Sequence, residues 1–186
     1  MLSIAGLRDL ARLVALFALL AMVVAYLNSL FSDEYSGRAH VLDGDSLRIA
    51  ETEIRLEGID APEFGQICRD ATGEGYDCGD RAKRALQQLV GGTIVTCQSA
   101  HTDRYGRALS VCWAENPDDA LNEAMVRSGW AVSYGGYAAV ERDARLRKVG
   151  LWAGSFEAPR DFRARRSDAV QTPWFMRLLG VGSDDE

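Results

Sequence analysis

The sequence predicts an α+β fold, in which a five-stranded β-barrel packs against three helices and follows one transmembrane helix. Three observations support this prediction. Residues 13–31 form an apolar run of 19 positions without a charge. The middle of the chain alternates apolar and polar residues with the period of a strand, whereas later segments show the period of a helix. Strands and helices are thus largely segregated along the chain, as in α+β proteins.

The N-terminal apolar run has the length of a membrane span, because about 20 apolar residues cross a bilayer core as a helix. Only Asn28 and Ser29 in it are strongly polar, so it lacks the polar face of a buried amphipathic helix. Arg8 and Arg12 precede it, and positive flanks favour the cytoplasmic side. We therefore expect a single-pass anchor, with the N-terminus in the cytoplasm and the body periplasmic or extracellular. A cleaved signal peptide, which usually has a shorter apolar region, is the alternative.

The elements of the body follow from periodicity and turn signals. We expect five strands, which share a period of two: residues 39–41, 47–49, 54–59, 93–98 and 108–114. We expect three helices, which share a helical period and end near glycine: residues 80–90, 120–128 and 137–149. The turn Asp43-Gly44-Asp45 is a strong hairpin signal between the first two strands. Three strands, a helix, two strands and further helices are the order of an OB-fold barrel.

This order divides the chain into three parts. Residues 1–35 are expected to hold the cytoplasmic lead, the anchor and a linker. Residues 36–166 form the OB-fold domain, in which residues 64–80 show no periodicity and are predicted to be a loop. Residues 167–186 form a C-terminal tail.

The charge balance argues against a tight, passive nucleic-acid binder. The whole chain has a formal net charge of −6, and residues 36–166 contain 18 Lys and Arg against 20 Asp and Glu. Nucleic-acid-binding domains are more often basic. An enzyme needs positive charge only locally and must release its product, so this class remains open.

The four cysteines all lie in the body, at positions 68, 78, 97 and 112. None is part of a CxxC motif, which disfavours a zinc ribbon. An even number in an oxidising compartment favours disulfides, and four cysteines allow three connectivities.

Three short segments concentrate the residues that can do chemistry. They contribute three carboxylates, Asp45, Asp60 and Glu63, and two arginines, Arg55 and Arg107. Carboxylate oxygens are hard ligands that suit Ca²⁺ or Mg²⁺, and guanidinium groups match phosphate oxygens. A cation held by carboxylates beside two arginines is an arrangement for phosphoryl transfer, because both spread the charge of the transition state.

The motifs that carry these residues occur together and in order. They are DGDS, RLEGIDAPE, DRYGR, LNEAMVRSGWA and E-x-x-AR-x-x-x-x-GLW. In this combination the sequence resembles the thermonuclease, or staphylococcal nuclease-like, family over about residues 38–163. The resemblance implies a calcium-dependent nuclease that hydrolyses phosphodiester bonds in DNA or RNA and leaves 3′-phosphates.

The resemblance also implies roles for individual residues. Asp45 and Asp60 match the calcium carboxylates, and Ala61 matches the residue whose carbonyl joins the metal shell. That position is Thr in the best-known member, so a hydroxyl is missing here. Arg55 and Arg107 match the phosphate-binding arginines.

Three further matches complete the implied site. Glu63 matches the proposed general base, while Arg104 and Tyr105 resemble a Lys-Tyr pair that contacts a neighbouring phosphate. Tyr134 is a loose match to a tyrosine of the nucleotide pocket. The expected partners are a nucleic-acid substrate and the membrane, with no obligate protein partner.

Two disulfides are expected, Cys97–Cys112 and Cys68–Cys78. The turn at 102–107 makes the fourth and fifth strands a hairpin, with Cys97 eight residues before Tyr105 and Cys112 seven after it. Opposed residues of such a pair lie at a Cα separation that a disulfide tolerates. Cys68 and Cys78 then remain, and related thermonuclease-like sequences resemble this chain in placing a cysteine pair in that loop.

Other residues and roles stay open on the sequence alone. We interpret His40 and His101 as surface residues. The basic run Arg160, Arg163, Arg165 and Arg166 is read as a solvated tail, with a phosphate-backbone contact as the alternative. A catalytically inactive OB-fold that binds nucleic acid or protein is the main alternative function, but such copies usually lose site residues that this sequence keeps. A structural spacer in the cell envelope is the second.

Overall fold

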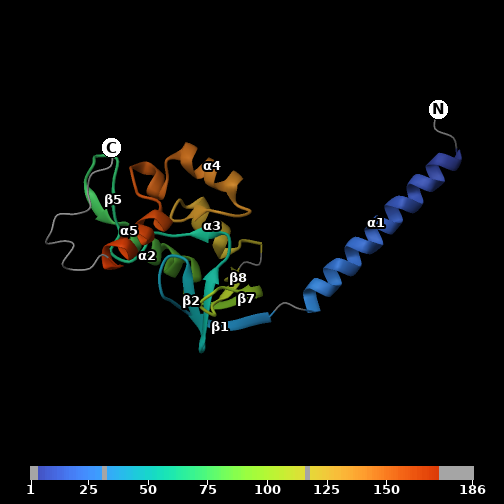
Figure 1. Cartoon of the computed structure of the whole chain (residues 1–186), viewed down its shortest axis with the longest axis horizontal. Coiled ribbons are helices and arrows are strands. Elements are labelled where there is room, and N and C mark those ends of the chain that lie inside the picture. Colours follow the sequence, from blue (N-terminus) through green and yellow to red (C-terminus); the bar gives the residue numbers. More distant parts are fainter. Residues whose placement is uncertain (1–3, 31–32, 116–117, 172–186) are drawn as a thin grey trace.

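The structure is a computed structural model that describes residues 4–30, 33–115 and 118–171. Helix α1 (Ile4–Leu30) stands apart from a rounded body that contains all the other elements (Figure 1). Residues 172–186, most of the expected C-terminal tail, lie outside the described residues.

The body is built on a closed five-stranded barrel, as predicted. Its strands are β1 (Asp33–Val41), β2 (Ser46–Ile49), β3 (Thr52–Leu56), β7 (Ile94–Thr102) and β8 (Ala108–Trp113). They close in the order β1-β2-β3-β8-β7, with β3 and β8 parallel and the other neighbours antiparallel. Strand β1 begins at Asp33, three residues before the predicted start of the body.

Two small sheets extend the barrel. Strand β4 (Ile59–Asp60) pairs with β9 (Val132–Ser133). Strand β5 (Ile67–Arg69) pairs with β6 (Gly75–Asp77). The second pair lies in the segment expected to be a loop. Each of its strands has only three residues, too few for a period of two to show in the sequence.

The helices follow the predicted order, with two additions. They are α2 (Cys78–Val90), α3 (Leu121–Arg127), α4 (Ala138–Arg147), the 3-10 helix η1 (Gly150–Ala153) and α5 (Pro159–Gln171). Helix α2 begins two residues earlier than expected, because Asp77 is its N-cap and accepts a hydrogen bond from the Asp80 amide. Helices η1 and α5 were not predicted, and α5 extends into the expected tail.

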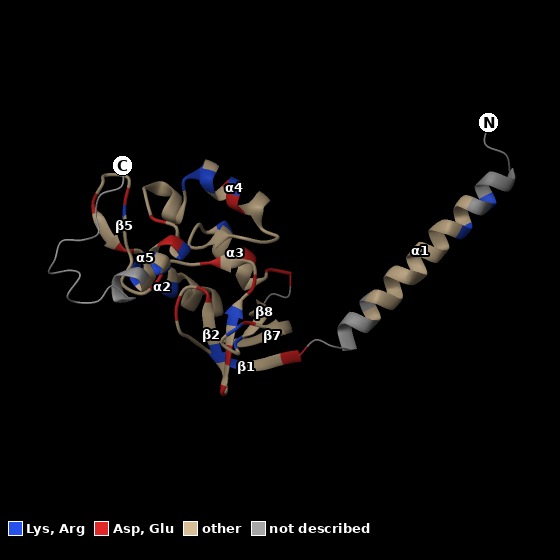
Figure 2. Ribbon diagram, in the orientation of Figure 1, with Lys and Arg blue, Asp and Glu red and all other residues tan. Residues whose placement is uncertain are grey.

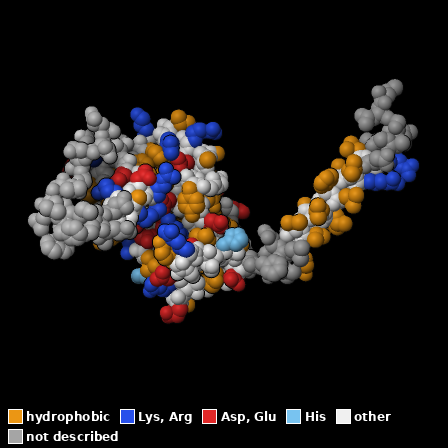
Figure 3. Space-filling view, viewed as in Figure 1, with side chains coloured by type: hydrophobic (Ala, Val, Ile, Leu, Met, Phe, Trp, Pro, Cys, Tyr) orange, Lys and Arg blue, Asp and Glu red, His pale blue; other side chains and the backbone are white. Residues whose placement is uncertain are grey.

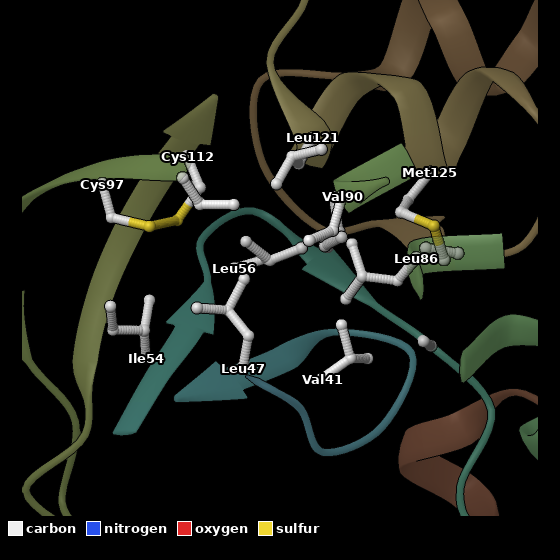
Figure 4. Close-up of a cluster of buried hydrophobic side chains, with 14 of the residues drawn as sticks. Val41, Leu47, Ile54, Leu56, Leu86, Val90, Cys97, Cys112, Leu121 and Met125 are labelled. Carbon is white, nitrogen blue, oxygen red and sulfur yellow. A yellow bond between two sulfur atoms is a disulfide. The ribbon is translucent and has the colours of Figure 1, made fainter. Parts of the chain in front are cut away.

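The main core lies between the barrel and the helices that cover it. Leu47, Ile54 and Leu56 of the barrel meet Leu86 of α2 and Met125 of α3, all fully buried (Figure 4). The buried Asn122 side chain ties α3 to the barrel: its Nδ2 donates to the carbonyls of Glu57 and Ser110, and its Oδ1 accepts from the Cys112 amide.

Both expected disulfides are present. Cys97 and Cys112 are register partners on β7 and β8 and are bonded to each other within the core (Figure 4). Cys68 of β5 is bonded to Cys78, the first residue of α2, and their Cα atoms are 5.6 Å apart. This second bond belongs to a smaller buried cluster with Leu151.

The predicted transmembrane helix is not supported. Figure 3 shows hydrophobic side chains along α1, yet within the described residues no helix combines the length and apolarity that a membrane crossing requires. Between Arg12 and its end at Leu30, α1 has 18 uncharged positions, of which Asn28 and Ser29 are polar. A bilayer core needs about 20 apolar residues.

Candidate active site

Two buried carboxylates meet at one end of the barrel. Asp45 ends the β1–β2 turn and Asp60 lies in β4, and the residues are 3% and 5% exposed. Gly44 permits this approach, because a Cβ atom there would lie 2.6 Å from the Cβ of Ala61 and 2.7 Å from that of Ala82. The turn therefore packs directly against the segment that follows Asp60.

Arg55 joins these two carboxylates. Its Nη1 donates to Asp45 Oδ1 and its Nη2 donates to Asp60 Oδ1, each at 2.7 Å. The arginine points from β3 with a side chain only 14% exposed. Ion pairs removed from water in this way are sensitive to the loss of either partner.

The two aspartates retain acceptor capacity for a cation. Asp45 Oδ1 accepts from Arg55 and from Ser46 Oγ, and its Oδ2 accepts from the Ala61 amide at 2.8 Å. Asp60 Oδ1 accepts from Arg55 and Arg163, and its Oδ2 accepts from Arg163. A carboxylate oxygen accepts about two hydrogen bonds, so each Oδ2 keeps one lone pair among the described contacts. These hard oxygen atoms fit Ca²⁺ or Mg²⁺.

Burial and the neighbouring charges of opposite sign act in opposite directions on the pKa values of Asp45 and Arg55. Burial raises the pKa of Asp45 to about 7, although the Arg55 guanidinium acts in the opposite direction. Burial acts to lower the pKa of Arg55, but Asp45 and Asp60 raise it above its ordinary value. Among the described residues no group of three or more His, Cys, Asp and Glu side chains is placed to hold a metal. A cation here would therefore rest on two aspartates and backbone or solvent oxygens.

Glu63 stands next to this pair on a restrained loop. Its amide donates to Gln66 Oε1 at 3.1 Å, and its backbone packs so closely on α2 that a Cβ atom at Gly79 would lie 2.0 Å from its carbonyl oxygen. Its side chain is 32% exposed and forms an ion pair with Arg163. The carboxylate is thus reachable from solvent while its backbone is fixed.

A second set of charged residues lies in the β7–β8 turn. The Asp103 carboxylate accepts from the Tyr105 and Arg107 amides and from Arg107 Nε. The guanidinium groups of Arg104 and Arg107 lie 4.8 and 5.5 Å from the centre of the Tyr105 ring. The aspartate therefore shapes the turn and orients Arg107.

These elements surround one cleft of 450 Å³. The cleft is lined by five of the residues that we expect to act on the substrate: Arg55, Glu63, Arg104, Tyr105 and Arg107. Asp43, Glu53 and Arg163 also line it. The structure thus brings the expected catalytic and substrate-binding residues together, with the buried Asp45, Asp60 and Ala61 behind them. Figure 2 shows acidic and basic residues interspersed over the body.

The comparisons with known proteins show the family of this chain. The family model described as "Staphylococcal nuclease homologue" matches residues 53–154. This chain belongs to the staphylococcal nuclease family. Its relatives include "Uncharacterized endonuclease" of Escherichia coli O157:H7, 33% identical over 70% of this chain and 84% of that protein. "Micrococcal nuclease" of Shigella flexneri is 30% identical over 76% of this chain and 87% of its own length.

A third relative has a different description. "Succinoglycan biosynthesis protein ExoI" of Rhizobium meliloti is 35% identical over 62% of this chain, which spans 63% of that protein. The family and the two nuclease relatives together support a hydrolytic nuclease.

A second cleft of 820 Å³ adjoins the nuclease site. It shares Arg55 and Arg163 with the first cleft, and Asp60 also lines it. Its other lining residues include the aromatic side chains of Tyr134, Trp152 and Phe156. Tyr134, the loosest of the sequence matches, therefore lies on this side. His40 and His101 are exposed, as expected.

Sequence reasoning missed one member of the site. Arg163 of α5, expected in a solvated tail or against a phosphate backbone, donates to both oxygens of Asp60 at 2.9 Å and also to Glu63. It lies nine residues beyond the end of the family match. The only signal in the sequence is the run of arginines, which does not indicate which one turns inward.

Proposed function

We propose that this protein is a calcium-dependent nuclease that hydrolyses phosphodiester bonds in DNA, RNA or both. The observation that carries the proposal is the position of Arg55. It joins two buried carboxylates and also lines the cleft that contains Glu63 and Arg107. The resemblance of the sequence motifs to the family implies functional roles for the same residues.

The Asp45 and Asp60 carboxylates and the Ala61 carbonyl would hold the calcium ion. Support comes from the lone pair that remains on each Oδ2 and from the burial of both aspartates. When bound, calcium supplies positive charge that stabilises the charge developing on the phosphate.

The protein's own groups would act on the phosphate and on water. Arg55 and Arg107 donate to the phosphate oxygens and stabilise the added negative charge, as fixed guanidinium groups do well. Glu63, the partly exposed carboxylate of the cleft, accepts the proton of the attacking water. Water then forms the new bond to phosphorus as the bond to the leaving oxygen breaks. Arg104 and Tyr105 contact the neighbouring phosphate.

The two clefts favour cleavage within a strand. Because Arg55 lines both clefts, a phosphate bound to it would have room for nucleotides on both sides. Aromatic rings in each cleft, Tyr105 in one and Tyr134 in the other, offer surfaces on which bases stack.

The test is digestion of single- and double-stranded DNA and RNA by the full-length protein. We expect cleavage with calcium and none in excess chelator, and Asp60→Asn should lose activity even with calcium. Binding without cleavage under all conditions would instead indicate the alternative, an inactive OB-fold that only binds. Full activity in chelator would refute the metal's role.

We also propose that the domain works outside the cytoplasm, in the periplasm or beyond the cell. Support comes from the two disulfides, which persist in oxidising compartments. Alkylation of the protein in intact cells, followed by mass analysis, should find no free thiol. Four alkylated cysteines would contradict this location.

A further inference from the structure

Arg163 links the two acidic parts of the nuclease site. Its Nη2 donates to Asp60 Oδ2, while its Nη1 donates to both Asp60 Oδ1 and Glu63 Oε1. One planar guanidinium therefore fixes the Glu63 carboxylate beside Asp60. Within the described part of the chain, the recorded hydrogen bonds to the Glu63 carboxylate come from Arg163 alone.

Helix α5 is itself tied to the loop that carries Glu63. Arg165 forms two hydrogen bonds with the Glu157 carboxylate, at 3.2 and 2.8 Å. The Glu157 carbonyl accepts from Gln66 Nε2 at 2.8 Å, and Gln66 Oε1 accepts from the Glu63 amide. Gln66 is 1% exposed. These hydrogen bonds connect the Glu63 loop to α5 through Gln66 and Glu157, and Arg163 of α5 in turn binds the Glu63 side chain.

These hydrogen bonds restrain the Glu63 side chain, which would otherwise be mobile. A partly exposed glutamate samples several rotamers, and a base must lie within hydrogen-bond reach of the water that it deprotonates. Arginine suits this positioning role because its planar guanidinium group can donate hydrogen bonds to two carboxylates in a fixed geometry. Misplacement of a catalytic group by about 1 Å can cost on the order of 10²-fold in rate.

We propose that Arg163 is a positioning residue of the nuclease reaction, which holds the Glu63 carboxylate beside Asp60 in the orientation from which it accepts the proton of water. Helix α5, outside the matched family region, is then a working part of the active site. This inference rests on the proposed nuclease function.

The same contacts allow a competing role, in which Arg163 occupies the metal site and blocks it. The two roles predict opposite effects of its removal. A blocking arginine would make Arg163→Ala bind calcium more tightly and cleave faster than wild type. The lone pair left on Asp60 Oδ2 favours positioning, since Arg163 takes only one of the two acceptor positions of this oxygen among the described contacts.

The experiment compares Arg163→Ala and Arg163→Lys with Arg84→Ala on the full-length protein. Arg84 is the control, because it lies on α2 and lines neither cleft, with a side chain 69% exposed that pairs with Asp80 of the same helix. Calcium affinity is measured by calorimetry, and kcat and KM on a defined oligonucleotide are then measured at saturating calcium. Melting curves establish that each variant is folded.

We expect Arg163→Ala to lower kcat about 10- to 100-fold and to change KM less than threefold, while Arg84→Ala behaves as wild type. Millimolar guanidinium ion should restore part of the kcat of Arg163→Ala but none of that of Glu63→Gln. Arg163→Lys, which keeps the charge without the fork, should fall between wild type and Arg163→Ala. If Arg163→Ala does not fold, the kcat of Arg163→Lys relative to wild type is the deciding measurement.

Three results would overturn the inference. They are a kcat for Arg163→Ala within threefold of the control, a rate above wild type with tighter calcium binding, or a loss confined to KM. In each of these cases wild type remains active, so only the role of Arg163 fails. A wild-type protein that cleaves no nucleic acid under any condition would refute the nuclease function and this inference with it.

Discussion

Replacing Arg55 by methionine should strongly destabilise the calcium-free protein. The side chains of Asp45 and Asp60 are 4% and 7% exposed, and that of Arg55 is 14% exposed. Removing one partner of such a buried pair costs about 3–5 kcal/mol, because an uncompensated charge stays behind. Asp60 keeps its pairing with Arg163, so the loss falls mainly on Asp45. We therefore expect the lower end of this range, about 3 kcal/mol.

The assay is urea unfolding of wild type and Arg55→Met, in chelator and in calcium at pH 8. Arg48→Met is the matched control: Arg48 pairs with Glu53 on neighbouring strands, but their side chains are 43% and 44% exposed. Such surface pairs contribute about 0–1 kcal/mol. Calcium should stabilise Arg55→Met more than wild type, because a cation replaces the lost guanidinium. A cost equal to that of the control would refute the proposed electrostatics.

Two further predictions concern pH and the barrel disulfide. Because burial raises the pKa of Asp45 to about 7, the folded state holds an extra proton between about pH 4 and 7, and this contribution to stability is lost as the pH rises through 7. The unfolding free energy of chelated wild type, relative to Asp45→Asn, should therefore fall from pH 5 to pH 8; a constant difference would contradict the shift. Replacing Cys97 and Cys112 by alanine opens a link of sequence separation 15, which should lower the unfolding free energy by about 3 kcal/mol in urea titrations. No loss would show that the bond does not stabilise the barrel.

The sequence was most informative where structure is local and regular. The alternation around Leu47 and Ile54 gave the barrel strands, and the turn between β7 and β8 was enough to place Cys97 opposite Cys112. The motif residues also came together around one cleft, because each lies at or near the end of a barrel strand or in the adjoining turn.

The remainder depends on contacts that no local pattern records. Helix α5 has little apolar periodicity, and polar pairs such as Arg165–Glu157 hold it instead. Arg163 meets Asp60 across a sequence separation of 103 residues. Among several arginines in one run, only the docking of the helix selects the one that enters the site.

The most direct test of the proposed site is the turnover number of Glu63→Gln on a defined oligonucleotide at saturating calcium. Glu51→Gln is the control, an exposed glutamate in the β2–β3 turn. The glutamine keeps the size of the side chain but cannot accept a proton as carboxylate does. The proposed mechanism predicts a kcat about 10²–10³ lower than wild type, with the control unchanged. A kcat for Glu63→Gln within threefold of wild type would contradict it.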